Sequence, residues 1–479
     1  MTKGQKVLKD ISFYSSSILI TQAITVVAAV LTRKFLGPIQ MGVWVFLQTI
    51  LSYFEFTALG TVLAASYEIP LHNGRGDFEK SKRVTNAAFS FALIVSVAFA
   101  FLVIVYAFRK RGYVREELFY GYIALAGFVV LQRFSGLAIT VVRAKKQFTI
   151  AGRQMLYSSI VNAFLVAILS YHFKIYGFLV AMAFSLLFNT GYLLWAARLR
   201  FQFTADWPEV GALIRYGFPL MLIGLFAAVF DTLDRLVITR FYGFKALGLY
   251  SVAIMALNYL NAIPNSVGIV TVSHLQEKVG AAGRIQALRK YVRKVDIGYG
   301  MLMMALVGTS WFLVPWLIRL VLPEFAQGIG ALRYLVLGAY FAALSQGYSQ
   351  LMYVIRKHKV LLLLLPAAGA AALLANWLAW RASLGVEGVA MAAAFAAFFY
   401  FTLLFFYGSM QVETFREALK RYAGVIGFFF FMLGLLFGID RWIVVRASAA
   451  APWIQAIVFT LFLSPFLWRG FRSLAHDTG

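Results

Sequence analysis

Runs of about twenty mostly apolar residues recur along the whole chain, and short polar segments separate them. In hydrocarbon every backbone polar group needs an internal hydrogen-bond partner, which leaves helices or a closed barrel as spanning structures. The runs lack the strict alternation of barrel strands. They predict an all-α, polytopic membrane protein with about fourteen transmembrane helices. The predicted limits are approximately 11–32, 41–67, 84–108, 118–142, 153–172, 175–197, 216–239, 246–274, 296–322, 328–355, 360–380, 386–409, 422–440 and 451–468.

One motif occurs twice in the chain. FLGPIQMGVW at residues 35–44 returns as FYGFKALGLY at residues 241–250, with Gly-x4-Gly between two aromatic residues, and VVRAKK at 141–146 is matched by VIRKHK at 354–359. The spacing contains six predicted helices, and an even number returns the chain to the same side. Parallel repeats of this kind are typical of two-lobed membrane transporters with a cavity between the lobes. We predict an N-lobe in 1–205 (helices 1–6), a C-lobe in 206–415 (helices 7–12) and a final helix pair in 416–479.

Composition agrees with a membrane location. The 479 residues are 62% hydrophobic and 13% charged, and the mean hydropathy is +0.79. Lys and Arg are about twice as frequent in the N-terminal tail and every second loop as in the other loops, so both termini are expected in the cytoplasm. The net charge of +25 therefore reflects topology and anionic lipid rather than nucleic acid, for which no soluble module is available.

Several kinds of chemistry find no support in the sequence. The chain has no cysteine, which excludes disulfides, thiol catalysis and Cys-based metal sites. It also lacks a His-rich metal cluster, a nucleophile elbow and a phosphate-cradling loop, and the outer turn at 35–41 has no carboxylate for a glycosyltransferase. We predict no enzyme activity, no catalytic residues, no metal and no cofactor.

Charged residues inside predicted spans are the candidate functional groups, because burying a charge in a bilayer costs about 2.5 to 3.5 kcal/mol on insertion scales. Arg133 is the first candidate for a substrate headgroup, since a guanidinium binds phosphate oxygens in a bidentate way. The alternative is a structural pair with Glu55 or another polar group. Arg153 and Arg333 are weaker headgroup candidates because they lie near predicted helix ends, where such side chains reach the interface.

The coupling or gate candidates are acidic. Glu55 is a candidate proton-coupling carboxyl, or else a neutral or Arg-paired one. Asp231 and Arg235 are spaced to pair on one helical face, and Asp234 can reach a helix of the other lobe or complete the network around Arg235. Such a network can act as a gate. Coupling to a proton gradient, a sodium gradient or the membrane potential stays open.

A proline surrounded by asparagines marks a further candidate. Pro264 removes a backbone donor within a predicted span. Asn258, Asn261 and Asn265 lie around it and can line a polar interior. We predict a cavity wall or hinge here, with ordinary helix irregularity as the alternative.

The chain resembles a known family in three places. These are the turn FLGPIQMG at 35–42, the acidic residue ahead of a glycine in the second helix (Glu55 and Gly60), and YGFPLMLIGLFAAVFDTLDRLVITRFYG at 216–243. Together with helix count and loop charge, they are similar to the oligosaccharide flippases of the multidrug/oligosaccharidyl-lipid/polysaccharide exporter (MOP) superfamily. The resemblance covers essentially the whole chain.

The resemblance implies two six-helix bundles, two further helices and alternating access. It implies that a lipid-linked glycan, carried on polyprenyl pyrophosphate, crosses a bacterial cytoplasmic membrane for O-antigen, capsule or exopolysaccharide assembly. The expected partners are this substrate, membrane lipids and glycan polymerase or ligase machinery, and a monomer is expected. Multidrug or peptidoglycan-precursor export within the same superfamily is the alternative.

Overall fold

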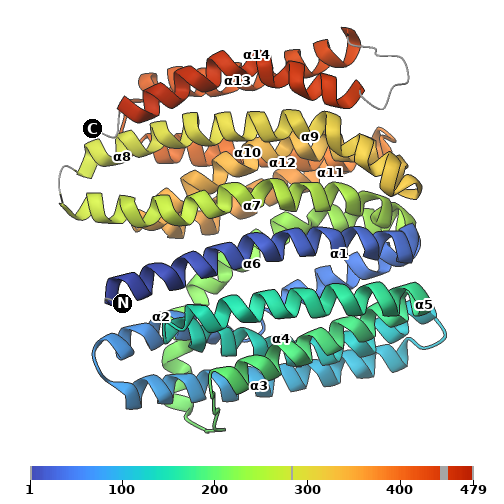
Figure 1. The fold of residues 1–479 in the computed structure, drawn as a ribbon, viewed down its shortest axis with the longest axis vertical. Helices are drawn as coiled ribbons and strands as arrows, with labels where there is room; N and C mark the ends of the chain where they lie inside the picture. Colours follow the sequence, from blue (N-terminus) through green and yellow to red (C-terminus); the bar gives the residue numbers. More distant parts are fainter. Residues whose placement is uncertain (1–2, 282–283, 443–450, 477–479) are drawn as a thin grey trace. The chain divides into compact units, whose positions relative to one another are not determined.

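The structure, a computed structural model, is all-helical. It describes residues 3–281, 284–442 and 451–476, and no β-strand occurs among them. Long helices run roughly alongside one another in each part of the chain (Figure 1). The side chains of residues 3–12, 15, 266–287 and 466–476 lie outside the description.

Two compact units make up the chain, Met1–Ala228 and Val229–Gly479. The first contains α1 (Lys3–Phe54), α2 (Thr61–Gly74), α3 (Phe78–Arg109), α4 (Glu116–Ala144), α5 (Phe148–Ala196) and the first part of α6 (Trp207–Phe241). The second contains the rest of α6, α7 (Gly243–Ala281), α8 (Arg284–Lys294), a π-helical turn (Val295–Tyr299), α9 (Gly300–Val321), a 3-10 turn (Pro323–Gly328), α10 (Ile329–Val354), α11 (Leu361–Arg381), α12 (Gly385–Ser409), α13 (Phe415–Trp442) and α14 (Ala451–His476).

Eleven helical segments among the described residues are long and apolar enough to cross a membrane. Two of them, Ser16–Phe54 and Phe148–Ala196, have 39 and 49 residues, about twice the length that spans a bilayer. Non-helical residues divide both, Gly37 (φ 67°) in α1 and Lys174 (φ 52°) in α5. With the shorter apolar helix Ala451–Pro465, the spans agree with the predicted number. The chain is therefore a multi-pass membrane protein.

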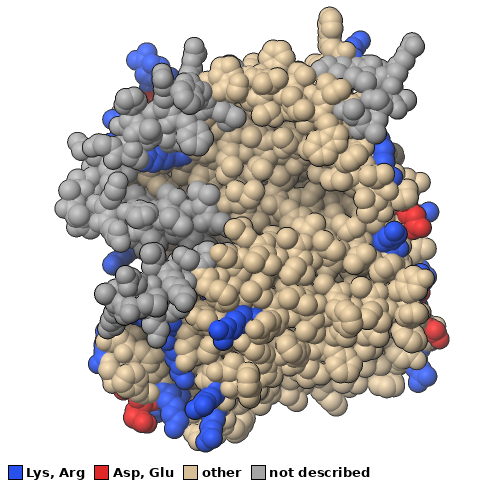
Figure 2. Space-filling model, in the orientation of Figure 1, with Lys and Arg blue, Asp and Glu red and all other residues tan. Residues whose placement is uncertain are grey.

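Charged side chains are concentrated at the ends of the helices. Figure 2 shows Lys and Arg gathered mainly there, with a broad surface between them that is almost free of charge. An uncharged band flanked by charged ends is what a bilayer-embedded surface requires.

Left-handed residues recur at matching turns of the two halves. Gly37 and Gly243 occupy the same place in the repeated motif, with φ of 67° and 79°. The turns after α4 and α10 place Lys146 and Arg356 at φ of 58° and 59°, and Lys174 is matched by Ser383. Non-glycine residues rarely adopt this conformation. The three pairs are 206, 210 and 209 residues apart, and the second differs from the offset of 213 at which VVRAKK and VIRKHK match in sequence.

The compact units divide inside α6, whereas the sequence repeat places the lobe boundary at residue 205. The reason is that the segment before α6 is bound to α3. The amide of Thr204 donates to the Ser90 hydroxyl at 2.8 Å. The Arg83 guanidinium binds both carboxylate oxygens of Asp206 and holds the pKa of that carboxyl below its usual value. The first half of α6 therefore packs with the first unit.

The second predicted helix, 41–67, is wrong as a continuous element. Helix α1 ends at Phe54, residues 55–60 form turns, and α2 begins at Thr61. Gly60 has φ of 82°, and a Cβ atom there would lie 2.4 Å from the carbonyl carbon of Gly217 in α6. Two glycines thus bring two backbones into contact, and the helix is interrupted where they meet.

Candidate functional site

A cavity of about 610 Å³ in the first unit lies beside the break between α1 and α2. Helices α4, α5 and α6 complete its wall, and the rings of Phe54 and Phe56 lie at the break. The polar side chains that line it are Glu55, Ser66, Gln132, Arg133, Ser135, Thr140 and Asn189. We call this space the first cavity.

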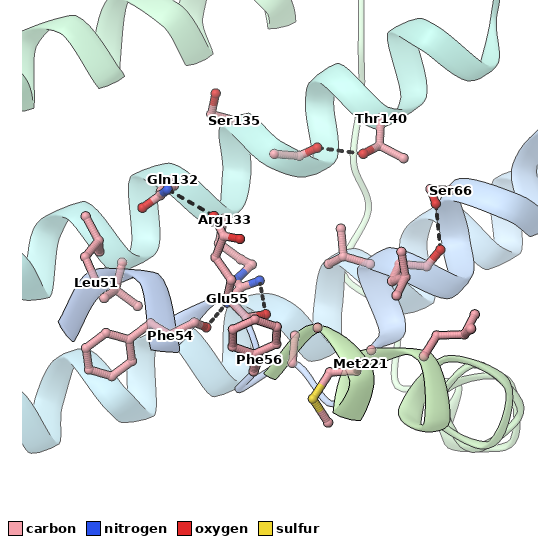
Figure 3. Close-up of a pocket in the computed structure, with 18 of the residues that line it drawn as sticks. Leu51, Phe54, Glu55, Phe56, Ser66, Gln132, Arg133, Ser135, Thr140 and Met221 are labelled. Atoms are coloured by element: carbon pink, nitrogen blue, oxygen red, sulfur yellow. Dashed lines mark hydrogen bonds between the residues drawn. The ribbon is translucent and has the colours of Figure 1, made fainter. Parts of the chain in front are cut away.

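Arg133 binds the backbone at the broken helix end (Figure 3). One terminal nitrogen donates to the main-chain oxygen of Glu55 at 3.1 Å, and the other donates to that of Phe54 and lies 3.5 Å from the Thr57 hydroxyl. The last carbonyls of a helix lack intrahelical donors and carry partial negative charge. Arg133 therefore caps the helix end, and no ion pair with the Glu55 carboxylate is formed among the described residues.

The Glu55 carboxylate is exposed to the first cavity. Its partner is neutral, since the Gln132 amide nitrogen donates to Glu55 Oε1 at 3.4 Å (Figure 3). The predicted proton-coupling role of Glu55 stays a prediction. The geometry adds that this side chain faces the cavity without a cationic partner in the described part of the chain.

An amide network supports the opposite wall. The Gln154 amide donates to Asn189 Oδ1 at 2.5 Å, and Asn189 Nδ2 donates to the Ser135 hydroxyl at 2.6 Å. These residues lie on α4 and on both halves of α5. These residues were not among the candidates predicted from sequence, because they carry no charge. The close spacing of Gln132, Arg133 and Ser135 within an apolar span was the available signal.

A second cavity, of about 200 Å³, lies in the second unit. Helices α6, α7, α10, α11 and α12 line it. It brings together most of the predicted coupling and cavity residues, and adds Asn376 of α11, which the sequence analysis missed. Its polar lining consists of Asp231, Asp234, Arg235, Asn258, Asn261 and Asn376.

The predicted pair of Asp231 and Arg235 is not formed. No ion pair within 4 Å joins them among the described residues, because i, i+4 spacing permits such a contact without requiring it. Asp234 instead accepts hydrogen bonds from the Tyr250 hydroxyl at 2.6 Å and from the backbone amide of Arg235 at 2.7 Å. Tyr250 is the last aromatic residue of the repeated motif. Its counterpart, Trp44, has no hydroxyl.

Replacing Tyr250 with phenylalanine is expected to lower the stability of the second unit by about 1–3 kcal/mol, because a buried carboxylate loses its donor. Tyr250 is fully buried, so no water takes its place. The check is thermal unfolding of the purified protein. Tyr113→Phe, at a residue that is 87% exposed, is the matched control. Equal melting temperatures for Tyr250→Phe and wild type would show that the hydroxyl is dispensable.

Three oxygen acceptors of the second cavity remain available. Asn261 Oδ1 and Asn376 Oδ1 are buried without a hydrogen-bond partner, while the Asn376 amide nitrogen donates to Ala372 at 2.8 Å. The carboxylate of Asp231 lines the same space. Buried acceptors of this kind are normally satisfied by water or by an ion.

Other predicted residues lie outside both cavities. Arg153 is exposed on α5. Arg333 of α10 pairs with Asp440 of α13 at 3.4 Å and lies over the Trp311 ring, 4.9 Å from its centre. Neither Arg153 nor Arg333 lines the first or the second cavity, where a substrate headgroup could bind.

The predicted hinge around Pro264 lies within α7. The helix continues through Pro264, and the Pro264 carbonyl accepts a hydrogen bond from the Tyr299 hydroxyl at 3.4 Å. Asn265 is exposed and does not line the second cavity. Among the asparagines around this proline, only Asn258 and Asn261 reach the cavity.

One arginine of α6 was not considered in the sequence analysis. Arg215 is exposed, and with Gly211, Ala212 and Tyr216 it lines a shallow hollow in the first unit. Within the described residues it has no ion-pair partner. It lies on the same helix as Leu220 and Met221, which line the first cavity.

The fold is that of MOP superfamily transporters. A MATE family multidrug resistance transporter in an inward-facing conformation is similar over 83% of this chain and 96% of its own, with a TM-score of 0.70 and 17% identity. The lipid II flippase MurJ in an inward closed conformation is similar over 96% and 99%, with a TM-score of 0.70 and 14% identity. A MOP superfamily transporter from Pyrococcus furiosus, described as having a binding pocket of reverse polarity, matches over 88% and 99%, with a TM-score of 0.63 and 17% identity.

No curated protein matches the sequence. A family model does, over residues 7–272, which is more than half of the chain. This segment includes the broken second helix, the whole first cavity, and Asp231, Asp234 and Arg235. The chain belongs to the polysaccharide biosynthesis protein family.

Proposed function

We propose that the chain is an alternating-access flippase for lipid-linked oligosaccharide, carried on polyprenyl pyrophosphate, which moves from the cytoplasmic to the outer leaflet. The first cavity is the observation that supports this most. It places seven polar side chains and two aromatic rings within spans that are otherwise apolar. Polar groups inside a membrane are costly and mark substrate pathways.

The chemistry of the first cavity suits a sugar. Amide and hydroxyl groups exchange hydrogen bonds with sugar hydroxyls, and the Phe54 and Phe56 rings offer flat apolar surface. Flipping changes no covalent bond, so it needs no catalytic residue. Family membership points to polysaccharide biosynthesis. We propose that the protein acts as a monomer in the inner membrane of a bacterium, with both termini cytoplasmic as the loop charges indicate, and that it supplies a polymerase or ligase.

Arg215 is the candidate contact for the pyrophosphate. Arg133 was the sequence-based choice, but each of its terminal nitrogens donates to a main-chain oxygen. The Arg215 guanidinium is exposed and free of an ion-pair partner in the described chain, and it can bind phosphate oxygens in a bidentate way. The lipid-borne charge then lies outside the first cavity and the glycan inside it.

The second cavity is the candidate coupling site. Asp231, Asn261 and Asn376 present oxygen atoms that can bind a sodium ion, or a proton on Asp231. Asp234 is held by Tyr250 and is less available.

Asp231→Asn is expected to reduce gradient-driven flipping about tenfold, because the cavity loses its freely available charge. The measurement is flipping in proteoliposomes under an imposed sodium or proton gradient. Asp440→Asn, a carboxylate outside this cavity, should retain the gradient dependence. An unchanged response in Asp231→Asn would remove the second cavity from coupling.

Export of organic cations is a second candidate function. The observation that favours it is the exposed Glu55 carboxylate, which can attract a cationic drug within the first cavity. Deletion of the gene distinguishes glycan flipping from export of organic cations. A flippase predicts loss of surface glycan with unchanged drug tolerance, and a drug exporter predicts the reverse.

Complementation of that deletion tests the proposed function. Wild-type protein should restore surface glycan, whereas Asn189→Leu should not, because it removes the amide that faces the first cavity. Gln350→Leu, outside both cavities, is a matched amide control. Full glycan export by Asn189→Leu at normal expression would contradict the assignment of the first cavity to the glycan.

A further inference from the structure

The charge of the first cavity depends on two side chains. Among the described residues that line it, only Arg133 and Glu55 carry formal charge. A guanidinium and a carboxylate in one cavity normally suggest neutrality or an ion pair. No ion pair within 4 Å joins these two side chains, and each has other hydrogen-bond partners.

Arg133 keeps its positive charge, but it is half-buried and directs its donors toward the broken helix end, whereas Glu55 is exposed to the cavity. Both of its terminal nitrogens donate to main-chain oxygens of Phe54 and Glu55. These carbonyls lie at a helix end and carry partial negative charge, which offsets part of the guanidinium charge. An anionic ligand that recruits Arg133 removes the donor of the Glu55 carbonyl, at a cost typical of a lost hydrogen bond, whereas the Phe54 carbonyl keeps the Thr57 amide and hydroxyl as donors.

Glu55 presents its charge directly. Its carboxylate is exposed to the cavity, and the neutral Gln132 amide is its hydrogen-bond donor at 3.4 Å. Nearby hydroxyls also act as acceptors toward a ligand. Ser66 donates to the Leu63 carbonyl at 2.7 Å and Thr140 donates to the Gly136 carbonyl at 2.8 Å, so their lone pairs remain for the cavity. This surface favours a ligand that donates hydrogen bonds.

We infer that Glu55 is a specificity-determining residue that excludes acidic sugars, so that the glycan segment bound in the first cavity is uncharged or carries amino groups. The inference rests on the proposed function and adds the charge class of its substrate. A second carboxylate within about 6 Å of Glu55 is repelled strongly in a low-dielectric space, whereas hydroxyl and ammonium groups donate to Glu55. The pyrophosphate is not affected, because it lies outside this cavity.

Equilibrium binding of two probes to the purified full-length chain tests the inference. The probes are short polyprenyl diphosphates that carry glucose or glucuronic acid, and they differ only by a carboxylate. Wild type should bind the glucose probe about tenfold more tightly. Glu55→Gln should reduce the difference to about twofold, by tightening the acidic probe. Glu55→Asp keeps the charge and should keep the preference.

A matched control is Glu324→Gln, which removes a carboxylate outside the cavity and should leave the preference at the wild-type value. Equal affinity of wild type for both probes, or a preference that survives in Glu55→Gln, would overturn the inference. If both probes also cross liposome membranes with wild-type protein, the flippase function stands and only the selectivity fails. If wild type binds neither probe, the proposed function and the inference fail together.

Discussion

Replacing Arg133 with methionine is expected to abolish flipping and to lower the stability of the first unit by about 2–5 kcal/mol. The side chain is half-buried and donates to the main-chain oxygens of Phe54 and Glu55, where α1 ends. Methionine has similar length and no donor, so the Glu55 carbonyl loses its donor and the partial negative charge of the helix end loses its nearby cation. Thermal unfolding of the purified protein and a liposome flipping assay measure the two effects.

Two further variants separate charge from geometry at this position. Arg133→Lys keeps the charge but has no planar fork to span two carbonyls, so an intermediate stability is expected. Arg153→Met, at an exposed arginine outside the cavity, should match wild type. If Arg133→Met unfolded at the wild-type temperature, the capping role would be refuted.

Gly60→Ala is expected to lower the stability of the first unit by about 3–5 kcal/mol, because it combines a backbone clash with a left-handed conformation. The added Cβ would lie 2.4 Å from the Gly217 carbonyl carbon, and the backbone has φ of 82°. Both effects act at the break that shapes the first cavity. Reduced accumulation in the membrane and a lower melting temperature are the expected observations.

Two control variants at other glycines separate the cost of the contact with Gly217 from the cost of the left-handed backbone conformation. Gly76→Ala has a similar φ of 77° but meets nothing within 4 Å, so it should show only the conformational cost of about 1 kcal/mol. Gly127→Ala lies within α4, with open space around it, and should be nearly neutral. A Gly60→Ala variant as stable as Gly76→Ala would mean that the contact with Gly217 is not close in the native protein.

The number and type of helices were predictable because apolar runs of spanning length have few alternatives in a membrane. Gly37 and Gly243 were predictable as tight turns because they recur in one motif, and both have positive φ. The turn at 55–60 was not. Its sequence, EFTALG, continues a helical pattern, and the break coincides with a close approach to Gly217, far away in sequence.

The candidate sites were predictable only where a charge revealed them. Asp231, Asp234 and Arg235 do line one cavity with Asn258 and Asn261. Their partners were not visible, because a tyrosine or asparagine in an apolar span resembles many others. The hydroxyl of Tyr250 and the amides of Asn189 and Asn376 gain their role from helices that meet only in the folded chain.

The same limit explains the change in the role expected for Arg133. From sequence, an arginine deep in a span suggests an anionic ligand or a polar side-chain partner such as Glu55. The structure supplies the partner as backbone, at a helix end that the sequence did not predict. The consequence is a first cavity in which Glu55 is the charged side chain most exposed to a ligand.

Flipping of a fluorescent polyprenyl-diphosphate-linked oligosaccharide by the purified full-length protein in liposomes tests the central claim most directly. Wild-type protein should move the probe between leaflets faster than protein-free liposomes do when a sodium or proton gradient is imposed, and Arg133→Met should not. The account would be contradicted if liposomes with wild-type protein moved the probe no faster than protein-free liposomes under both gradients, while a thermal unfolding transition showed that the protein was folded.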